Sequence, residues 1–193
     1  MVVTESGEWE YDDQEHELFD YVAQGVLENH QCEFTVESIR NVGIKENRAV
    51  VVAIVDENGV DVTHNYAIEY TYGTLTVTPR PLEVITNNGE WVYDGEDHAV
   101  EEFLVNGLLE DHVGDYQIAS IRDVGTMDNS VTVTAIYNAD GENVAPNYAI
   151  DYQYGSLTVT HRPLSIMTND GERTLTRLEV IITEGKNREV RRM

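Results

Sequence analysis

The stretch NYAIEYTYGTLTVTPRPLEVITNNGEW, residues 65–91, decides the fold, because it returns as NYAIDYQYGSLTVTHRPLSIMTNDGE at residues 147–172. The offset from residue 65 to residue 147 is 82 residues, and the alignment needs no gap. The same offset pairs Trp9 with Trp91. A repeat of this period indicates one small module used in tandem. The quoted stretch closes one module and opens the next.

We therefore expect one module at residues 1–80 and a second at residues 81–162, each large enough for a modest core. A third copy starts at residue 163 but stops matching at Arg173, where a tryptophan would recur. We interpret residues 163–193 as the start of a third repeat joined to a basic tail, and we favour an artificial join of unrelated sequences. Since the chain begins inside a repeat, we expect it to be a piece of a longer protein.

The amino-acid composition excludes several kinds of protein. The chain has 12 Lys and Arg against 36 Asp and Glu, a net charge of −24. Such a charge favours solubility and argues against nucleic-acid binding by the repeats. Cys32 is the only cysteine, which excludes an internal disulfide. No apolar run is long enough to span a bilayer, and the chain carries no signal or anchor motif, so we expect no membrane contact.

The last strand of each repeat is the clearest element. Apolar and polar residues alternate there with period two, as in a half-buried strand. In the first copy the apolar set is Tyr66, Ile68, Tyr70 and Tyr72. The apolar positions then change parity, which predicts a bulge or tight bend at Gly73 and at Gly155. We expect the tyrosine row to be a packed sheet face, with a sugar-binding platform as the alternative.

The segment around Leu18 and Val22 leaves two structures open, because its apolar spacing fits a helix and a short strand. We predict an all-β chain of two small immunoglobulin-like sandwich modules, with a β-grasp-like variant if the helix forms. Trp9 and Trp91 lie in strand-like runs, each with a tyrosine two residues on, and we expect both to be core residues. Pro79 and Pro81 predict a short, stiff joint.

The sequence gives little support for a metal site. The paired histidines are His16 with His98 and His30 with His112. Without cysteine partners in the same module, we expect them to be structural or solvated. The acidic turns at residues 56–61 and 138–143 lack the bidentate glutamate of a calcium loop. A hairpin turn explains them, and calcium binding is the alternative.

The sequence shows no recognisable set of catalytic residues. No nucleophile–base pair, paired carboxylates or Gly-rich phosphate loop stands out from the acidic surface. We predict no enzyme activity, no catalytic residues and no cofactor.

Residues 2–172 resemble the YDG- and MBG-type repeats of bacterial, Firmicutes-like cell-surface adhesins and S-layer-like proteins. The resemblance is carried by Y-D-G-x-x-H, I-x-D-V-G-T-x-x-N and N-Y-x-I-x-x-x-x-G-x-L-x-V-T-x-R-P. Its residues in the second copy are Tyr93, Asp94, Gly95, His98, Ile121, Asp123, Val124, Gly125, Asn129, Asn147, Tyr148, Ile150, Gly155, Leu157, Val159 and Pro163. The first copy departs at Asp13, where glycine is usual, which leaves open whether the turn is the same. The resemblance implies an extracellular all-β module with no catalytic residues.

The tail LEVIITEGKNREVRRM resembles the E-G-K-N-R-x-V-R-R-M motif of bacterial ribosomal RNA pseudouridine synthases, over about 20 residues. That family implies RNA contacts by Lys186, Arg188, Arg191 and Arg192. Its catalytic aspartate lies in a G-R-L-D motif that this chain lacks, so no activity follows. Its first part, LEVIITEG, is strand-like and the basic end, NREVRRM, allows a helix, which together would form a short β-α tail.

The function predicted from these patterns is a non-catalytic spacer or stalk on a bacterial cell surface, whose partners are the neighbouring repeats. The first alternative is an adhesin module that binds cell-wall glycan or a host surface protein, and such a site would break the repeat symmetry or expose aromatic side chains. The second alternative, supported by the tail alone, is a fragment of a pseudouridine synthase.

Overall fold

The computed structural model describes residues 1–164, 179–180 and 190–191. The chain divides into two compact units, Met1–His161 and Arg162–Met193, and the first contains both repeats. In the second unit, β17 (Glu179–Val180) pairs antiparallel with β18 (Val190–Arg191). The helix allowed for NREVRRM is therefore wrong at residues 190–191, where the β-branched valine lies in a strand.

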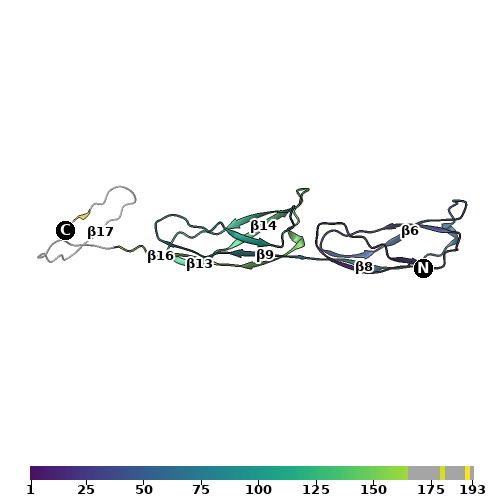
Figure 1. The fold of residues 1–193 in the computed structure, drawn as a ribbon, viewed down its shortest axis with the longest axis horizontal. Coiled ribbons are helices and arrows are strands. Elements are labelled where there is room, and N and C mark those ends of the chain that lie inside the picture. The colour runs from purple at the N-terminus through teal and green to yellow at the C-terminus, as the bar shows by residue number, and fades with distance from the viewer. Residues whose placement is uncertain (165–178, 181–189, 192–193) are drawn as a thin grey trace. The chain divides into compact units, whose positions relative to one another are not determined.

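The first module is built from short strands and one 3-10 turn. In chain order they are β1 (Val2–Thr4), β2 (Gly7–Glu10), β3 (Tyr21–Ala23), β4 (Gln31–Val36), β5 (Gly43–Asn47), β6 (Ala49–Val55), η1 (Thr63–Asn65), β7 (Tyr70–Thr71) and β8 (Gly73–Thr78). Figure 1 shows β6 and β8 on opposite sides of this module. The strands form three small sheets, β3-β1-β7, β2-β8-β5 and β4-β6.

The second module repeats these elements. In chain order they are β9 (Arg80–Thr86), β10 (Gly89–Val92), β11 (Phe103–Asn106), β12 (Val113–Ile118), β13 (Gly125–Asp128), β14 (Val131–Tyr137), η2 (Ala145–Asn147), β15 (Tyr148–Gln153) and β16 (Ser156–Thr160). Its sheets are β11-β9-β15, β10-β16-β13 and β12-β14. Each strand pairs as its counterpart does in the first module, so the prediction of one shared all-β fold is confirmed.

In each module the first two strands lie in different sheets, and the last two strands pair with them in the same two sheets. In the first module β1 pairs in parallel with β7, and β2 pairs in parallel with β8. The switch comes at Gly73, where a Cβ atom would overlap the carbonyl oxygen of Glu5. Gly155 meets the carbonyl of Asn87 in the same way. The bend predicted from the change of parity is therefore present, and only glycine fits it without a backbone shift.

The ambiguous segment is a strand in both modules. It forms β3 in the first and β11 in the second, each antiparallel to the strand that opens its module. The described residues form no α-helix, so the helical reading, and with it the β-grasp-like variant, is wrong. The apolar spacing suggested one face of a helix, but Leu18 lies before β3 and Val22 lies within it. The Val22 side chain is also exposed, so the two residues do not form a buried face.

The two tryptophans are only partly buried. Trp9 stacks on His16 with ring centroids 4.7 Å apart, and Trp91 stacks on His98 at 4.8 Å. Both rings also pack against the buried clusters of their modules. The prediction that they are core residues therefore holds in part, because both side chains pack against buried clusters but are themselves only half-buried.

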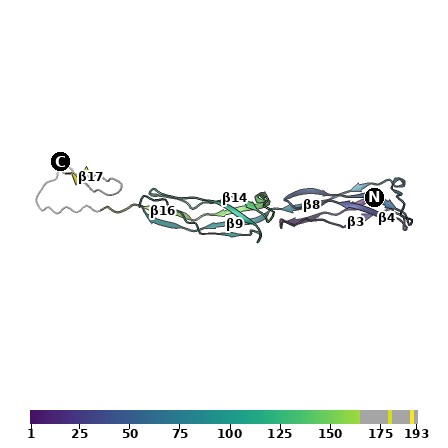
Figure 2. The same cartoon turned by 90° about the horizontal axis from the view of Figure 1, so that it is seen from above.

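Only Pro79 separates β8, which ends at Thr78, from β9, which begins at Arg80. The link between the modules is therefore one residue long, and proline fixes its φ angle. None of the helical segments in the described part of the chain has the length and apolar character needed to cross a bilayer. Figure 2 shows the same strands from above.

Candidate functional site: the junction between the two modules

Tyr11 lies at the end of the first module that carries the link, and it is the centre of the junction. It follows β2 directly, and none of its side chain is exposed. It belongs to one buried cluster with Val77 of the first module and Ile136 of the second. Its counterpart at the far end of the second module, Tyr93, is 37% exposed. The two tyrosines occupy equivalent positions, so contact between modules accounts for the difference.

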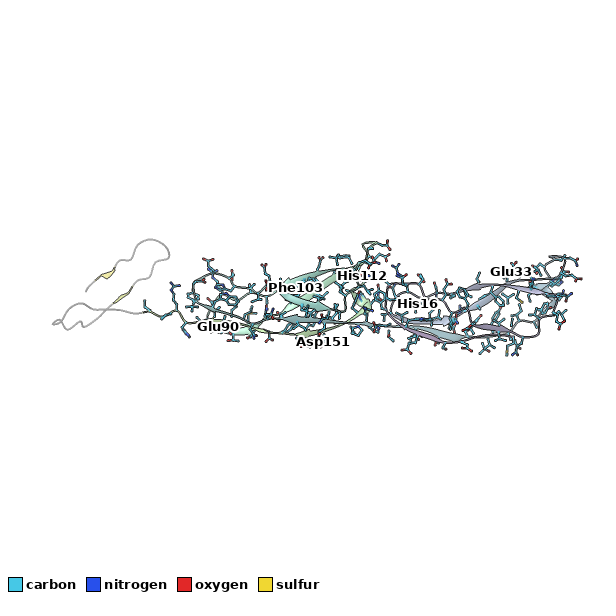
Figure 3. All side chains as sticks on the ribbon, in the orientation of Figure 1. His16, Glu33, Glu90, Phe103, His112 and Asp151 are labelled. Carbon is cyan, nitrogen blue, oxygen red and sulfur yellow. The ribbon has the colours of Figure 1, made fainter. Side chains whose placement is uncertain are left out.

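Aromatic rings from the second module surround Tyr11. The Tyr148 ring meets it edge-on, with centroids 5.7 Å apart, and the His112 ring lies at 6.3 Å. The Tyr148 hydroxyl accepts the Leu109 backbone N–H (3.4 Å) and lies 2.8 Å from His112 Nδ1. With the hydroxyl donating to Nδ1, His112 Nε2 carries the proton and points at Asp13 Oδ2, 3.4 Å away. Figure 3 labels His112 at this end of the second module.

Asp13 gathers the polar contacts of the junction. Its Oδ1 accepts the Tyr11 hydroxyl at 2.7 Å and Arg40 Nε at 3.1 Å. Its Oδ2 lies 3.0 Å from the Arg40 guanidinium and accepts Asn138 Nδ2 at 3.4 Å. One carboxylate thus joins two groups of the first module to Asn138 and His112 of the second. Hydrogen bonds to a charged acceptor are about twice as strong as neutral ones.

The backbone at Asp13 keeps the turn of the second copy. Its φ angle is +64°, and that of its counterpart Gly95 is +89°. The turn is therefore the same in both modules, although Asp13 stands where the repeat pattern has glycine. Aspartate tolerates this left-handed conformation better than most residues, but at some cost in free energy.

The surroundings stabilise the ionised form of Asp13. Burial raises the pKa of this carboxyl, but the hydrogen bonds from Tyr11, Arg40 and His112 outweigh it and hold the pKa below its usual range. Burial and the adjacent Asp13 raise the pKa of Tyr11, so its hydroxyl remains a proton donor. Arg40 also lies 3.8 Å from Asp140 of the second module. The junction is thus a carboxylate with a guanidinium beside it and further hydrogen-bonding groups from both modules around it.

Further contacts hold the ends of the two modules together. The Asn147 side chain accepts the Val42 backbone N–H at 2.9 Å and donates to Asn41 Oδ1 at 2.8 Å. At the link, Arg80 forms a 2.9 Å ion pair with Glu10. Asn147 is buried, whereas its counterpart in the first module, Asn65, is exposed. The repeat symmetry is thus broken where the modules meet.

The histidines predicted to be structural have side-chain partners within the fold. His16 and His98 stack on tryptophans and hydrogen-bond to Asp12 and Asp94. His30 lies 2.7 Å from the Tyr66 hydroxyl, the same pairing as His112 with Tyr148. Within the described residues, no three His, Cys, Asp or Glu side chains come together where they could share an ion.

The two acidic turns form hairpin connections. Asp56 Oδ1 accepts the backbone N–H groups of Asn58 and Val60, both at 2.9 Å. Asn138 Oδ1 accepts the Glu142 N–H at 2.9 Å. These oxygens therefore hold the turns themselves, and in the second module Asn138 also reaches Asp13.

The tyrosine rows pack in part. Tyr70 stacks on Tyr72 with centroids 5.5 Å apart, and the Tyr152 and Tyr154 rings lie at 5.6 Å. The Tyr152 hydroxyl accepts the Val133 N–H at 3.2 Å. Tyr154 is 40% exposed, so the row reaches the surface at its end.

The residues with a predicted RNA role are not brought into any described site. Lys186, Arg188 and Arg192 lie outside the described residues, and of Arg191 only the backbone, in β18, is described. No family model, curated protein or solved structure matches the chain. Both resemblances therefore stay predictions.

Sequence reasoning did not find the junction. It treated Tyr11 and Tyr93 as equivalent and noted Asp13 only as a departure from a turn pattern. The clue in the sequence was Asp13 itself, because a charged residue at a position that favours glycine indicates a stabilising contact nearby. Arg40 recurs as Arg122, so the repeat alone gave no indication that it would pair with Asp13.

Proposed function

We propose that the chain is a non-catalytic structural spacer of a bacterial cell-surface protein, in which a specific junction holds each module on the next. The observation that carries this proposal is the burial of Tyr11 in a cluster shared by both modules, beside an exposed counterpart at Tyr93. A chain whose modules merely followed one another would expose both tyrosines alike.

The contacts suit a connection that restricts movement between the modules. Tandem modules gain stability from nearest-neighbour interfaces as well as from their own cores. Here the interface combines a fully buried aromatic ring, a carboxylate with four hydrogen-bonding partners and a one-residue link at Pro79. Each part restricts rotation between the modules, and together they favour a spacer with a defined reach over a flexible tether.

The resemblance of residues 2–172 to repeats of large surface proteins supports the same role and the extracellular location. The acidic surface supports it further, since net charge of one sign keeps an extended protein soluble and discourages collapse. Asp and Glu outnumber Lys and Arg by 36 to 12.

Residual dipolar couplings of the full chain test the proposal, because they report the orientation of each module in one aligning medium. We expect residues 2–78 and 80–160 to fit a single alignment tensor. The double variant Tyr11→Ala, Asp13→Gly should need two tensors. Tyr93→Ala is the matched control at the equivalent position and should behave as wild type. Two independent tensors in the wild-type chain would contradict a spacer with a fixed junction.

A further inference from the structure

The first and the last strands of a module run side by side in the same direction. In the second module β9 pairs in parallel with β15 over residues 80–85. Beyond the change of sheet, β10 pairs in parallel with β16 over residues 89–92. We call residues 80–92 the opening segment and residues 148–160 the closing segment. Both segments therefore run from the end of the module that carries the link to its far end.

Side chains join the two segments where the strands change sheets. The Gly155 N–H donates to Thr86 Oγ1 at 2.9 Å, and the Ser156 N–H donates to Asn88 Oδ1 at 2.8 Å. Each of these bonds links a residue of the closing segment to a residue of the opening segment. The segments are thus bonded in both sheets and also at the change of sheet between them.

The first module repeats these bonds. Its β2 pairs in parallel with β8. The Gly73 N–H donates to Thr4 Oγ1 at 3.0 Å, and the Thr74 N–H donates to Ser6 Oγ at 2.9 Å. Ser6 stands where the second module has Asn88, and both side chains supply an acceptor oxygen at the same place. The arrangement is therefore a property of the repeated module.

Tension along the chain would strain all of these bonds together. The chain enters the second module at Arg80, where β9 begins, and leaves it after Thr160, where β16 ends. β9 lies near the link and β16 at the far end of the module (Figure 1). Pulling at these points slides the two parallel segments past each other. The interstrand hydrogen bonds run between the strands, so sliding stretches every bond at once and none can break alone.

Pulling across a hairpin would strain the bonds one after another. β12 and β14 are antiparallel, and Val113 lies opposite Tyr137 at the open end of the pair. A force that separates these two residues breaks their contact first and then moves to the next pair. A single hydrogen bond contributes only about 0.5–1.5 kcal/mol net, so the resistance depends on how many bonds must break together.

We propose that each module bears tension through its opening and closing segments, so that the chain resists stretching from end to end much more strongly than separation of its hairpins. This mechanical function rests on the proposed spacer function, since a spacer between a cell and a distant target is stretched along its length. Residues 93–147 of the second module lie between the two segments in the sequence and outside the direct path of the force. Forced unfolding is governed by the unfolding rate, so the direction of pulling matters even when the equilibrium stability is unchanged.

Single-molecule stretching of the full chain in two directions tests the proposal. Handles on peptide tags at the two termini pull the modules end to end, whereas handles on the thiols of Val113→Cys and Tyr137→Cys pull β12 from β14. Both positions are exposed, and Cys32→Ser removes the only native thiol, so one protein serves for both directions. End-to-end pulling should give one unfolding step per module and need a several-fold higher force than the hairpin.

The length of chain released identifies each step. A module of 82 residues has an extended length of about 270–295 Å, and its end-to-end step should release this length less the folded length of the module. The hairpin step, between residues 113 and 137, should release less than about 90 Å.

Asn88→Ala tests the bonds between the segments, because it removes the acceptor of the Ser156 N–H. It should lower the force of one end-to-end step, that of the second module, and leave the other step unchanged. Thr134→Ala is the matched control at another exposed residue. It removes a bond to the Asp115 carbonyl within the β12–β14 pair, outside both segments, and should leave both end-to-end steps as in wild type.

Equal unfolding forces in the two directions would overturn the proposal, as would an end-to-end force that Asn88→Ala and Thr134→Ala lower alike. The module orientations are measured without applied force, so this failure would leave the spacer function standing.

Discussion

Replacing Tyr11 with alanine should destabilise both modules. The side chain is fully buried and belongs to a cluster with residues of each module, such as Val77 and Ile136. Truncation of a buried aromatic residue to alanine typically costs about 3–5 kcal/mol, through lost burial and the cavity left behind. The edge-on contact with Tyr148 is part of that loss. We expect the free energy of unfolding to fall by about 4 kcal/mol.

Urea denaturation followed by tryptophan fluorescence can assign this loss, because each module has one tryptophan. Trp91→Phe leaves Trp9 to report the first module, and Trp9→Phe leaves Trp91 to report the second. Tyr11→Ala should shift both transitions, whereas Tyr93→Ala, at an exposed counterpart, should cost less than about 1 kcal/mol. A loss below about 1 kcal/mol for Tyr11→Ala, or one confined to the first module, would refute the argument from the shared cluster.

Three further predictions concern single side chains. Asp13→Gly should lower the free energy of unfolding by about 1–3 kcal/mol, because the carboxylate contacts are worth more than the strain that glycine relieves. In the same denaturation assay, Gly95→Asp should change the stability by less than about 1 kcal/mol, because a bond from Arg122, the counterpart of Arg40, would roughly offset the left-handed strain. The folded pKa of Asp13 is lowered, so its stabilisation is complete above the ordinary carboxyl pKa of about 3.9 and is lost as the pH falls through the folded value. Thermal melts in that acid range should therefore depend less on pH in Asp13→Asn than in wild type, and equal slopes would contradict the assignment. Trp91→Ala should cost about 2 kcal/mol, since its side chain is only partly buried, and a loss near 5 kcal/mol would contradict partial burial.

The sequence predicts the fold well where local pattern and repeat agree. The ungapped offset predicts that β1 to β8 recur as β9 to β16, because an inserted residue would turn every later side chain to the other face. The recurrence extends to the register shift of the β4–β6 pair, where Val52 of β6 is the extra residue, which returns in the β12–β14 pair at Thr134. The bend at Gly73 could also be predicted, because the apolar residues move from even-numbered to odd-numbered positions there. This change is visible in one short stretch of sequence and needs no distant partner.

The sequence does not predict the features that depend on distant partners. A short apolar segment near Val22 fits a helix and a strand equally, and only its pairing with β1 decides. The stacking of Trp9 on His16 needs a contact across a turn of unknown shape. The junction is harder still, since Tyr11 and Tyr93 are the same residue in the same local sequence and differ only in what lies against them.

Position 13 is aspartate where the second module has glycine, and two opposing free energies explain the difference: backbone strain and the hydrogen bonds of the carboxylate. A non-glycine residue in the left-handed region loses roughly 1–2 kcal/mol relative to ordinary backbone. In isolation this would favour glycine, as at Gly95, where nothing lies within 4 Å of a Cβ atom. At the junction, however, the carboxylate of Asp13 receives hydrogen bonds from Arg40, His112 and Asn138, and bonds to a charged group contribute about 1.5–3 kcal/mol each. Arg40 belongs to the same module as Asp13, whereas His112 and Asn138 belong to the second, so the junction adds to the hydrogen bonds that offset the strain.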